Sequence, residues 1–164
     1  MTIIPPFNLF DWIKNNRDLL KPPVGNKNLY VDAGDYIVMI VGGPNARKDY
    51  HYNETEELFF QLEGEIIIKT QQDGKCVDIP LKEGEMFLLP AKVPHSPNRS
   101  KNSIGLVIER KREPHHKDGL MWFSDQENAL LYEEYFHLTN IEKDFLPVFK
   151  RFYSDEKLLS LIHI

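Results

Sequence analysis

Residues 29–110 contain a series of short apolar segments with β-forming residues, separated by residues typical of turns. This pattern restricts the possible folds of the chain more than any other feature. Stretches rich in glycine, proline and asparagine, such as Gly42–Asn45 and Asp73–Gly74, separate the runs. Many short strands at this spacing are typical of an antiparallel sandwich or barrel. The expected strands are Leu29–Val31, Tyr36–Val41, Leu58–Leu62, Glu65–Thr70, Cys76–Ile79, Met86–Leu89 and Ile104–Glu109.

The segments on either side of this β-rich core differ in character. Asn8 to Leu20 has apolar residues at roughly helical spacing, which predicts an N-terminal helix. After residue 110 we expect two more strands, Leu120–Phe123 and Ala129–Phe136, and a closing helix over Asn140–Phe152 that Pro147 limits or kinks. We therefore predict a single domain over residues 1–164, with a core at about 29–110 and a C-terminal extension over 111–164.

Composition narrows the class of protein. The net charge is -5 and no basic stripe is present, which argues against a nucleic-acid partner. No apolar run reaches the length of a membrane span, and the N-terminus lacks the pattern of a secretory signal. The one cysteine, Cys76, rules out an internal disulfide and a cysteine-based metal cluster. We therefore expect a cytoplasmic protein that does not associate with membranes.

Two histidines and a carboxylate, His51, Glu57 and His95, form the most informative set of polar residues. Such a set can hold divalent iron and leave coordination positions open. Glu54 and Glu56 are rival carboxylates. Glu56 would face the opposite side of a strand and Glu54 falls in a turn, so Glu57 is the better candidate.

Two arginines accompany the histidines. Arg47 lies four residues before His51, and Arg99 lies four residues after His95. On a strand a spacing of four returns to the same face, so each arginine could point into the same cavity as its histidine. The alternative is a solvated rim. A buried guanidinium needs an anion and matches a carboxylate in fork geometry, so metal and arginines together favour a small anionic substrate.

These spacings resemble the two short motifs of the cupin superfamily, a double-sheet jelly roll. The matching positions are Glu57, Gly64, Gly84, Pro90 and His95. Asn53 replaces the usual second histidine of the first motif, and Arg99 replaces the usual final asparagine of the second. The resemblance implies an all-β cupin double-stranded β-helix with an N-terminal helix and a C-terminal strand and helix extension. It also implies three protein ligands for the metal: His51, Glu57 and His95.

Longer stretches are similar to the 3-hydroxyanthranilate 3,4-dioxygenase family. They are Leu20–Asn26, Val41–Arg47, Asp49–His51, Phe87–Pro90 and Val93–Pro97 with Arg99. The likeness runs from Phe7 to about Arg110 and continues more weakly through Phe152. It implies an Fe2+-dependent, extradiol-type dioxygenase that uses O2 to open the ring of 3-hydroxyanthranilate. The product, 2-amino-3-carboxymuconate semialdehyde, cyclises to quinolinate for NAD biosynthesis in the kynurenine pathway.

The same resemblance implies roles for residues around the metal. Arg47 and Arg99 would hold the substrate carboxylate. Glu109 would contact the iron-binding edge of the substrate and assist proton transfer as a catalytic residue. The other substrate contacts that it implies are Phe59, Pro97 and the metal ligand Glu57.

The C-terminal segment departs from the family pattern. Many bacterial and fungal members carry a second, rubredoxin-like iron site made of cysteine pairs, but Trp122–Glu127 and Leu158–Ile164 contain no cysteine. We therefore predict one Fe2+ per chain and an apolar tail that packs on the barrel or on a neighbouring subunit of a homodimer. His115 and His116 are expected to be surface residues.

Two other classes of function stay open. One is a different cupin enzyme, such as an isomerase or a dioxygenase of a related aminophenol, which would not need both arginines. The other is a ligand-binding or storage cupin. Such proteins often lose metal ligands, whereas this chain retains all three.

Overall fold

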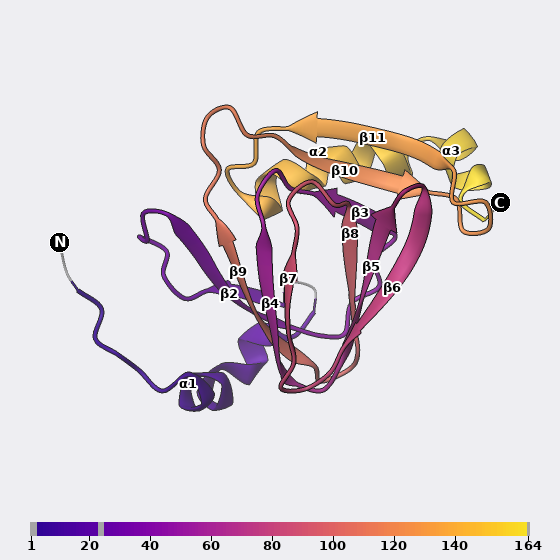
Figure 1. The fold of residues 1–164 in the computed structure, drawn as a ribbon. Helices are drawn as coiled ribbons and strands as arrows, with labels where there is room; N and C mark the ends of the chain where they lie inside the picture. Colours follow the sequence, from indigo (N-terminus) through magenta and orange to yellow (C-terminus); the bar gives the residue numbers. More distant parts are fainter. Residues whose placement is uncertain (1–2, 23–24, 164) are drawn as a thin grey trace.

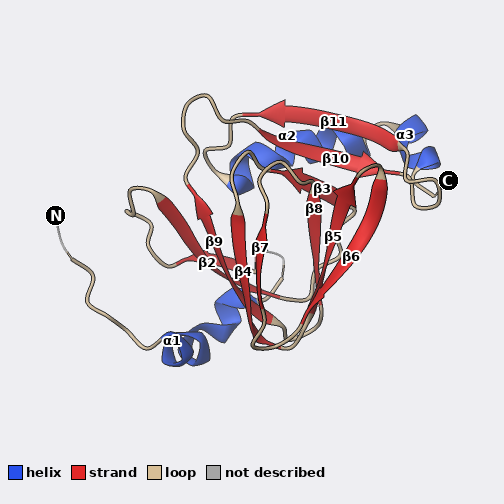
Figure 2. Cartoon of the chain, viewed as in Figure 1, coloured by secondary structure: helices blue, strands red, loops and turns tan. Residues whose placement is uncertain are grey.

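The computed structural model describes residues 3–22 and 25–163. The middle of the Leu20–Asn26 motif therefore lies outside the described residues. Two antiparallel sheets face each other, with helices at both ends of the chain (Figures 1 and 2). Near the N-terminus, helix α1 (Leu9–Asn16) leads into a 3-10 turn, η1 (Arg17–Leu20), as the apolar spacing predicted. The side chain of Asn8 caps α1 by accepting a hydrogen bond from the Asp11 amide at 3.0 Å.

The strands are arranged as one long hairpin that wraps around the interior of the barrel. Their bounds are β1 (Asn26–Asn28), β2 (Tyr36–Gly42), β3 (Asp49–Tyr52), β4 (Glu57–Glu63), β5 (Ile66–Gln72), β6 (Lys75–Leu81), β7 (Met86–Leu89), β8 (His95–Arg99), β9 (Ile104–Arg110), β10 (Asp118–Phe123) and β11 (Leu130–Phe136). One sheet has the order β1-β2-β9-β4-β7 and the other the order β11-β10-β3-β8-β5-β6.

This order makes the barrel a jelly roll. Strand β5 pairs with β6 at the tip of the hairpin, followed by β4 with β7, β3 with β8, and β2 with β9. Successive pairs alternate between the two sheets, so the long hairpin wraps around a single interior. The predicted all-β cupin double-stranded β-helix is confirmed.

Side chains alternate between the inner and outer faces of the strands, and those on the inner faces fill the interior. Side chains that point inward from both sheets form an apolar core, which contains Met39, Phe59, Ile66, Ile68, Leu81, Leu89 and Val107. Polar residues share the same inner faces at two register positions. Glu57 lies opposite Glu109 in the β4–β9 pair, and His51 lies opposite His95 in the β3–β8 pair. One sheet therefore supplies two acids and the other supplies two histidines.

The C-terminal extension widens the second sheet and covers one of its faces. Strands β10 and β11 continue this sheet beyond β3, and helices α2 (Ile141–Tyr153) and α3 (Glu156–Leu161) lie against them (Figure 1). Trp122 stacks on Phe152 with ring centroids 4.2 Å apart. Ile162 is buried in the same cluster, so the described part of the apolar tail packs on its own chain. None of the helices in the described ranges is long and apolar enough to cross a membrane.

The structure corrects some of the predicted elements. The strand expected at Leu29–Val31 is wrong, because the first strand is β1 and the chain turns directly after it. The Asn28 side chain accepts a hydrogen bond from the Tyr30 amide at 3.0 Å, which holds this turn. Helix α2 also continues past Pro147 to Tyr153. Strands β3 and β8 and helix α3 were not predicted either.

Candidate metal centre and cavity

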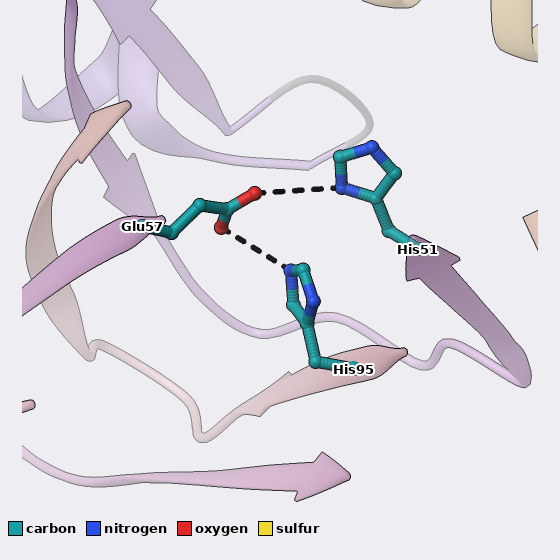
Figure 3. A group of neighbouring side chains, drawn as sticks. All are labelled: His51, Glu57 and His95. Carbon is teal, nitrogen blue, oxygen red and sulfur yellow. Dashed lines mark ion pairs between the residues drawn. The ribbon is translucent and has the colours of Figure 1, made fainter. Parts of the chain in front are cut away.

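Two histidines and one glutamate converge inside the barrel. His51 Nδ1 lies 3.6 Å from Glu57 Oε1, and His95 Nε2 lies 3.2 Å from Glu57 Oε2 (Figure 3). All three residues are buried. Because β3 and β8 pair in one sheet and β4 belongs to the other, the three side chains meet across the interior.

The remaining ring nitrogens of the two histidines are already engaged. His51 Nε2 lies 2.7 Å from Asp118 Oδ2, and His95 Nδ1 lies 3.0 Å from the carbonyl oxygen of Val93. Both acceptors are oxygens to which these nitrogens can donate, which leaves the two ring nitrogens that face Glu57 available to a metal ion. The three ligand atoms lie within 4.8 Å of one another. Imidazole nitrogen and carboxylate oxygen suit a divalent transition metal, so this set can hold a metal ion.

Asn53, in the place of the missing cupin histidine, joins the two acids. Its amide nitrogen donates to Glu57 Oε1 at 3.1 Å and to Glu109 Oε2 at 3.4 Å. Burial alone would raise the pKa of the Glu57 carboxyl, but His95 and His51 outweigh it and hold this pKa well below its ordinary value. Burial and the Glu57 charge raise the pKa of Glu109 to about 7, against the opposing effect of Arg112. The two acids therefore differ in their affinity for a proton.

A cavity of about 670 Å³ opens beside this triad. Arg47, Arg99, Phe59, Pro97 and Glu109 all line it, so the structure brings together every site residue that the sequence indicated. Phe59 comes from β4 and Pro97 from β8, on opposite sheets. Helix α2 contributes an apolar part of the wall, made of Ile141, Phe145, Leu146, Phe149 and Tyr153.

The two arginines occupy different environments. Arg99 lies on β8, on the same face as His95, and is 6% exposed. Within the described residues its Nη1 atom makes no hydrogen bond. Burial and the charge of Arg47 lower the pKa of Arg99 to about 10, so the guanidinium stays protonated at neutral pH. Arg47 precedes β3 instead of lying on it, and it forms an ion pair with Asp49.

Other residues considered as ligands lie elsewhere. Glu56 is exposed, and Glu54 accepts a hydrogen bond from the Lys117 amide at 3.3 Å. A second group, Glu113 with His115 and His116, brings its ligand atoms together on the surface. It lies in the loop between β9 and β10 and does not line the cavity.

Sequence reasoning missed Asp118 and Arg112. Asp118 is buried and accepts from the His51 ring, while Arg112 donates to both Asp118 and Glu109. The stretch from Lys111 to Gly119 is polar and matches no motif, so nothing local marks these charges as buried. Their position becomes visible only when β10 is placed beside β3.

Comparisons with known proteins identify relatives of this chain. The pattern of the family described as 3-hydroxyanthranilic acid dioxygenase matches residues 1–153. A protein of Xanthomonas campestris pv. campestris (strain B100) named 3-hydroxyanthranilate 3,4-dioxygenase is 60% identical over 151 residues, which cover 92% of this chain and 85% of that protein. A protein of Nematostella vectensis with the same name is 48% identical over 91% of this chain and 54% of its own length.

Solved structures also resemble the chain. A cupin-2 domain containing protein from Shewanella frigidimarina NCIMB 400 has a TM-score of 0.49 and 21% sequence identity. The match covers 60% of this chain and 91% of that protein.

Proposed function

Because the chain belongs to the 3-hydroxyanthranilic acid dioxygenase family, we propose that its cavity binds 3-hydroxyanthranilate and is where the aromatic ring is opened with O2. The observation that carries this proposal is the pairing of functions in one cavity. A His-Glu-His set that can hold a metal lies beside two guanidinium groups that can bind a carboxylate. An aromatic acid whose ring is opened with O2 needs the metal for the reaction and the guanidinium groups to bind its carboxylate.

The metal in this proposal is one Fe2+ per chain, held by His51, Glu57 and His95. When bound there, Fe2+ would supply the electron-transfer chemistry that allows O2 to react with an aromatic ring. Each histidine turns one ring nitrogen toward the Glu57 carboxylate, while its other ring nitrogen contacts an oxygen acceptor, which supports this ligand set. The protein provides a buried and oriented set of donors.

Arg99 is the principal anchor for the substrate carboxylate. It is buried and charged, and its Nη1 atom has no hydrogen-bond partner among the described residues, so binding an anion there satisfies this donor. Arg47 acts as the second anchor from the more open side of the cavity, where it is already held by Asp49. Phe59 and Pro97 line opposite walls and restrict the tilt of the ring between them.

Glu109 receives the proton of the substrate hydroxyl. Its carboxylate lies beside the triad, linked to Glu57 through Asn53. A carboxyl with a raised pKa is a better proton acceptor than an ordinary surface glutamate. The ring bond between the hydroxyl-bearing carbon and the unsubstituted carbon beside it then breaks, and both atoms of O2 are retained in the semialdehyde product. Cyclisation of this product with loss of water gives quinolinate.

Oxygen uptake by the Fe2+-loaded protein tests the proposal. We expect 3-hydroxyanthranilate to consume one O2 per molecule of quinolinate formed. Anthranilate, which lacks the hydroxyl, should give no uptake. If protein shown to contain iron consumes no O2 with 3-hydroxyanthranilate, the proposed substrate is wrong.

A dioxygenase for a related aminophenol is the second candidate, since the same triad would serve it. The Arg99 Nη1 donor, which has no partner in the part of the chain that the structure describes, favours a substrate with a carboxylate. Faster turnover of 2-aminophenol than of 3-hydroxyanthranilate would reverse this preference. We also propose that the protein is a homodimer, as the family resemblance implies, and light scattering of the purified protein would test this.

A further inference from the structure

A buried carboxylate contacts one of the two candidate histidine ligands on the side of its ring that faces away from Glu57. Asp118 lies at the start of β10, beside β3, and its Oδ2 atom is 2.7 Å from His51 Nε2. The Asp118 side chain is 1% exposed and that of His51 is 9% exposed. A hydrogen bond in this position fixes both the rotation of the imidazole ring and the nitrogen that carries its proton.

Arg112 in turn holds Asp118. Its Nε atom donates to Asp118 Oδ1 at 2.9 Å, and its Nη2 atom donates to Oδ2 at 2.6 Å. This two-point contact uses both carboxylate oxygens and fixes the orientation in which Asp118 meets the His51 ring. The third arm, Nη1, reaches Glu109 Oε2 at 2.5 Å. The Arg112 side chain is 2% exposed, so the contacts are shielded from solvent.

We propose that Asp118 and Arg112 are positioning residues that fix His51 so that Nδ1, and not Nε2, is its metal-binding atom. This inference rests on the metal centre of the proposed function. It makes the two histidines unequal, because His95 presents Nε2 while its Nδ1 atom is held by a backbone carbonyl. The same Arg112 holds Glu109, so one guanidinium positions a metal ligand and the proposed proton acceptor together.

A purely structural role is the competing explanation. An ion pair between Arg112 and Asp118 also ties the end of the β9–β10 loop to the sheet, and its loss would lower stability without a specific effect on the metal. Metal affinity measured on the folded protein separates the two roles. An outer partner that orients a ligand typically changes metal affinity by about 10- to 100-fold.

The first experiment is calorimetric titration of the metal-free protein with Co2+. We expect Asp118→Asn, checked for folding by circular dichroism, to bind Co2+ about 10- to 100-fold more weakly than the wild type. Asp78→Asn is the matched control. It also removes a carboxylate from an ion pair, with Lys69 at 3.1 Å, but it lies on the exposed surface of β6. Equal Co2+ affinity in Asp118→Asn and the wild type would overturn the inference.

A second measurement needs no variant and remains decisive if Asp118→Asn does not fold. In the Zn2+-loaded wild type, nitrogen NMR of the histidine rings should show His51 bound through Nδ1 with its proton on Nε2, and His95 bound through Nε2. Binding of His51 through Nε2 would overturn the inference. A wild-type protein that binds neither Co2+ nor Zn2+ would overturn the proposed metal centre, and the inference with it.

Discussion

Arg99 Nη1 lies 3.0 Å from the point where a Cβ atom at Gly105 would stand. Gly105 belongs to β9 and faces Gln61 of β4, whose Oε1 atom would be 3.1 Å from the same Cβ. A glycine on this strand therefore leaves room for the guanidinium that we propose as the carboxylate anchor.

Replacing Gly105 with alanine should displace Arg99. We expect Gly105→Ala to bind 3-hydroxyanthranilate about tenfold more weakly, a loss of about 1.4 kcal/mol, with unchanged metal affinity. Binding measured by calorimetry under anaerobic conditions would show this. Gly34→Ala is the control, because nothing lies within 4 Å of its added Cβ. Equal losses in the two variants would mean that Arg99 is not the group affected.

Removing the guanidinium itself gives a sharper test of the anchor. Arg99→Ala should bind 3-hydroxyanthranilate about 10- to 100-fold more weakly, because a charge-assisted contact with the substrate carboxylate is lost. Binding of 2-aminophenol, which has no carboxylate, should change little. Arg110→Ala removes an exposed arginine from the last position of β9 and serves as the control. A similar loss for both ligands in Arg99→Ala would contradict the carboxylate assignment.

The fold was predictable from the sequence wherever a strand contained an aliphatic run. Strand β2, with Tyr36 to Val41, and strand β9, with Ile104 to Glu109, were identified from such runs. Strands β3 and β8 were missed because β3 reads Asp-Tyr-His-Tyr and β8 contains Pro97. Their residues are specialised for the site, so they lack the usual signal of a strand.

The site was predictable where its residues follow a motif, and not where they form a network in space. The spacing of His51, Glu57 and His95 marked them as a candidate metal set, and the structure brings their side chains together. Asp118 was not found because it lies 67 residues from the histidine that it contacts, and only the pairing of β10 with β3 joins them. Burial of Arg112 is equally invisible, since its neighbours along the chain are polar.

Loss of one imidazole should remove the metal. His95→Ala should fail to retain Fe2+ after desalting and should lose the rise in melting temperature that a bound metal gives. That stabilisation is about 2.7 kcal/mol when the free metal concentration is 100 times its dissociation constant. Metal analysis and thermal unfolding with and without Fe2+ would measure both effects.

The surface group in the β9–β10 loop provides the control for this test. His116→Ala removes an imidazole from the other set of clustered ligand atoms, formed with Glu113 and His115. Iron content should be unchanged in this variant. Loss of iron from His116→Ala, with retention in His95→Ala, would move the metal from the cavity to the surface.

Glu109 should lower the stability of the metal-free protein as the pH rises from about 4.5 to 7. Burial and the Glu57 charge raise the pKa of Glu109 in the folded state to about 7, above its ordinary value of 4.5. Between these values the folded state binds more protons than the unfolded state, so raising the pH favours unfolding. The contribution of Glu109 to the free energy of unfolding is about 3 kcal/mol for a pKa shift of this size.

Urea unfolding of the metal-free protein across this pH range should show a steeper fall in stability for the wild type than for Glu109→Gln. Glu56→Gln, which removes an exposed carboxylate, should keep the wild-type slope. The same slope in Glu109→Gln and the wild type would show that another group titrates in this window.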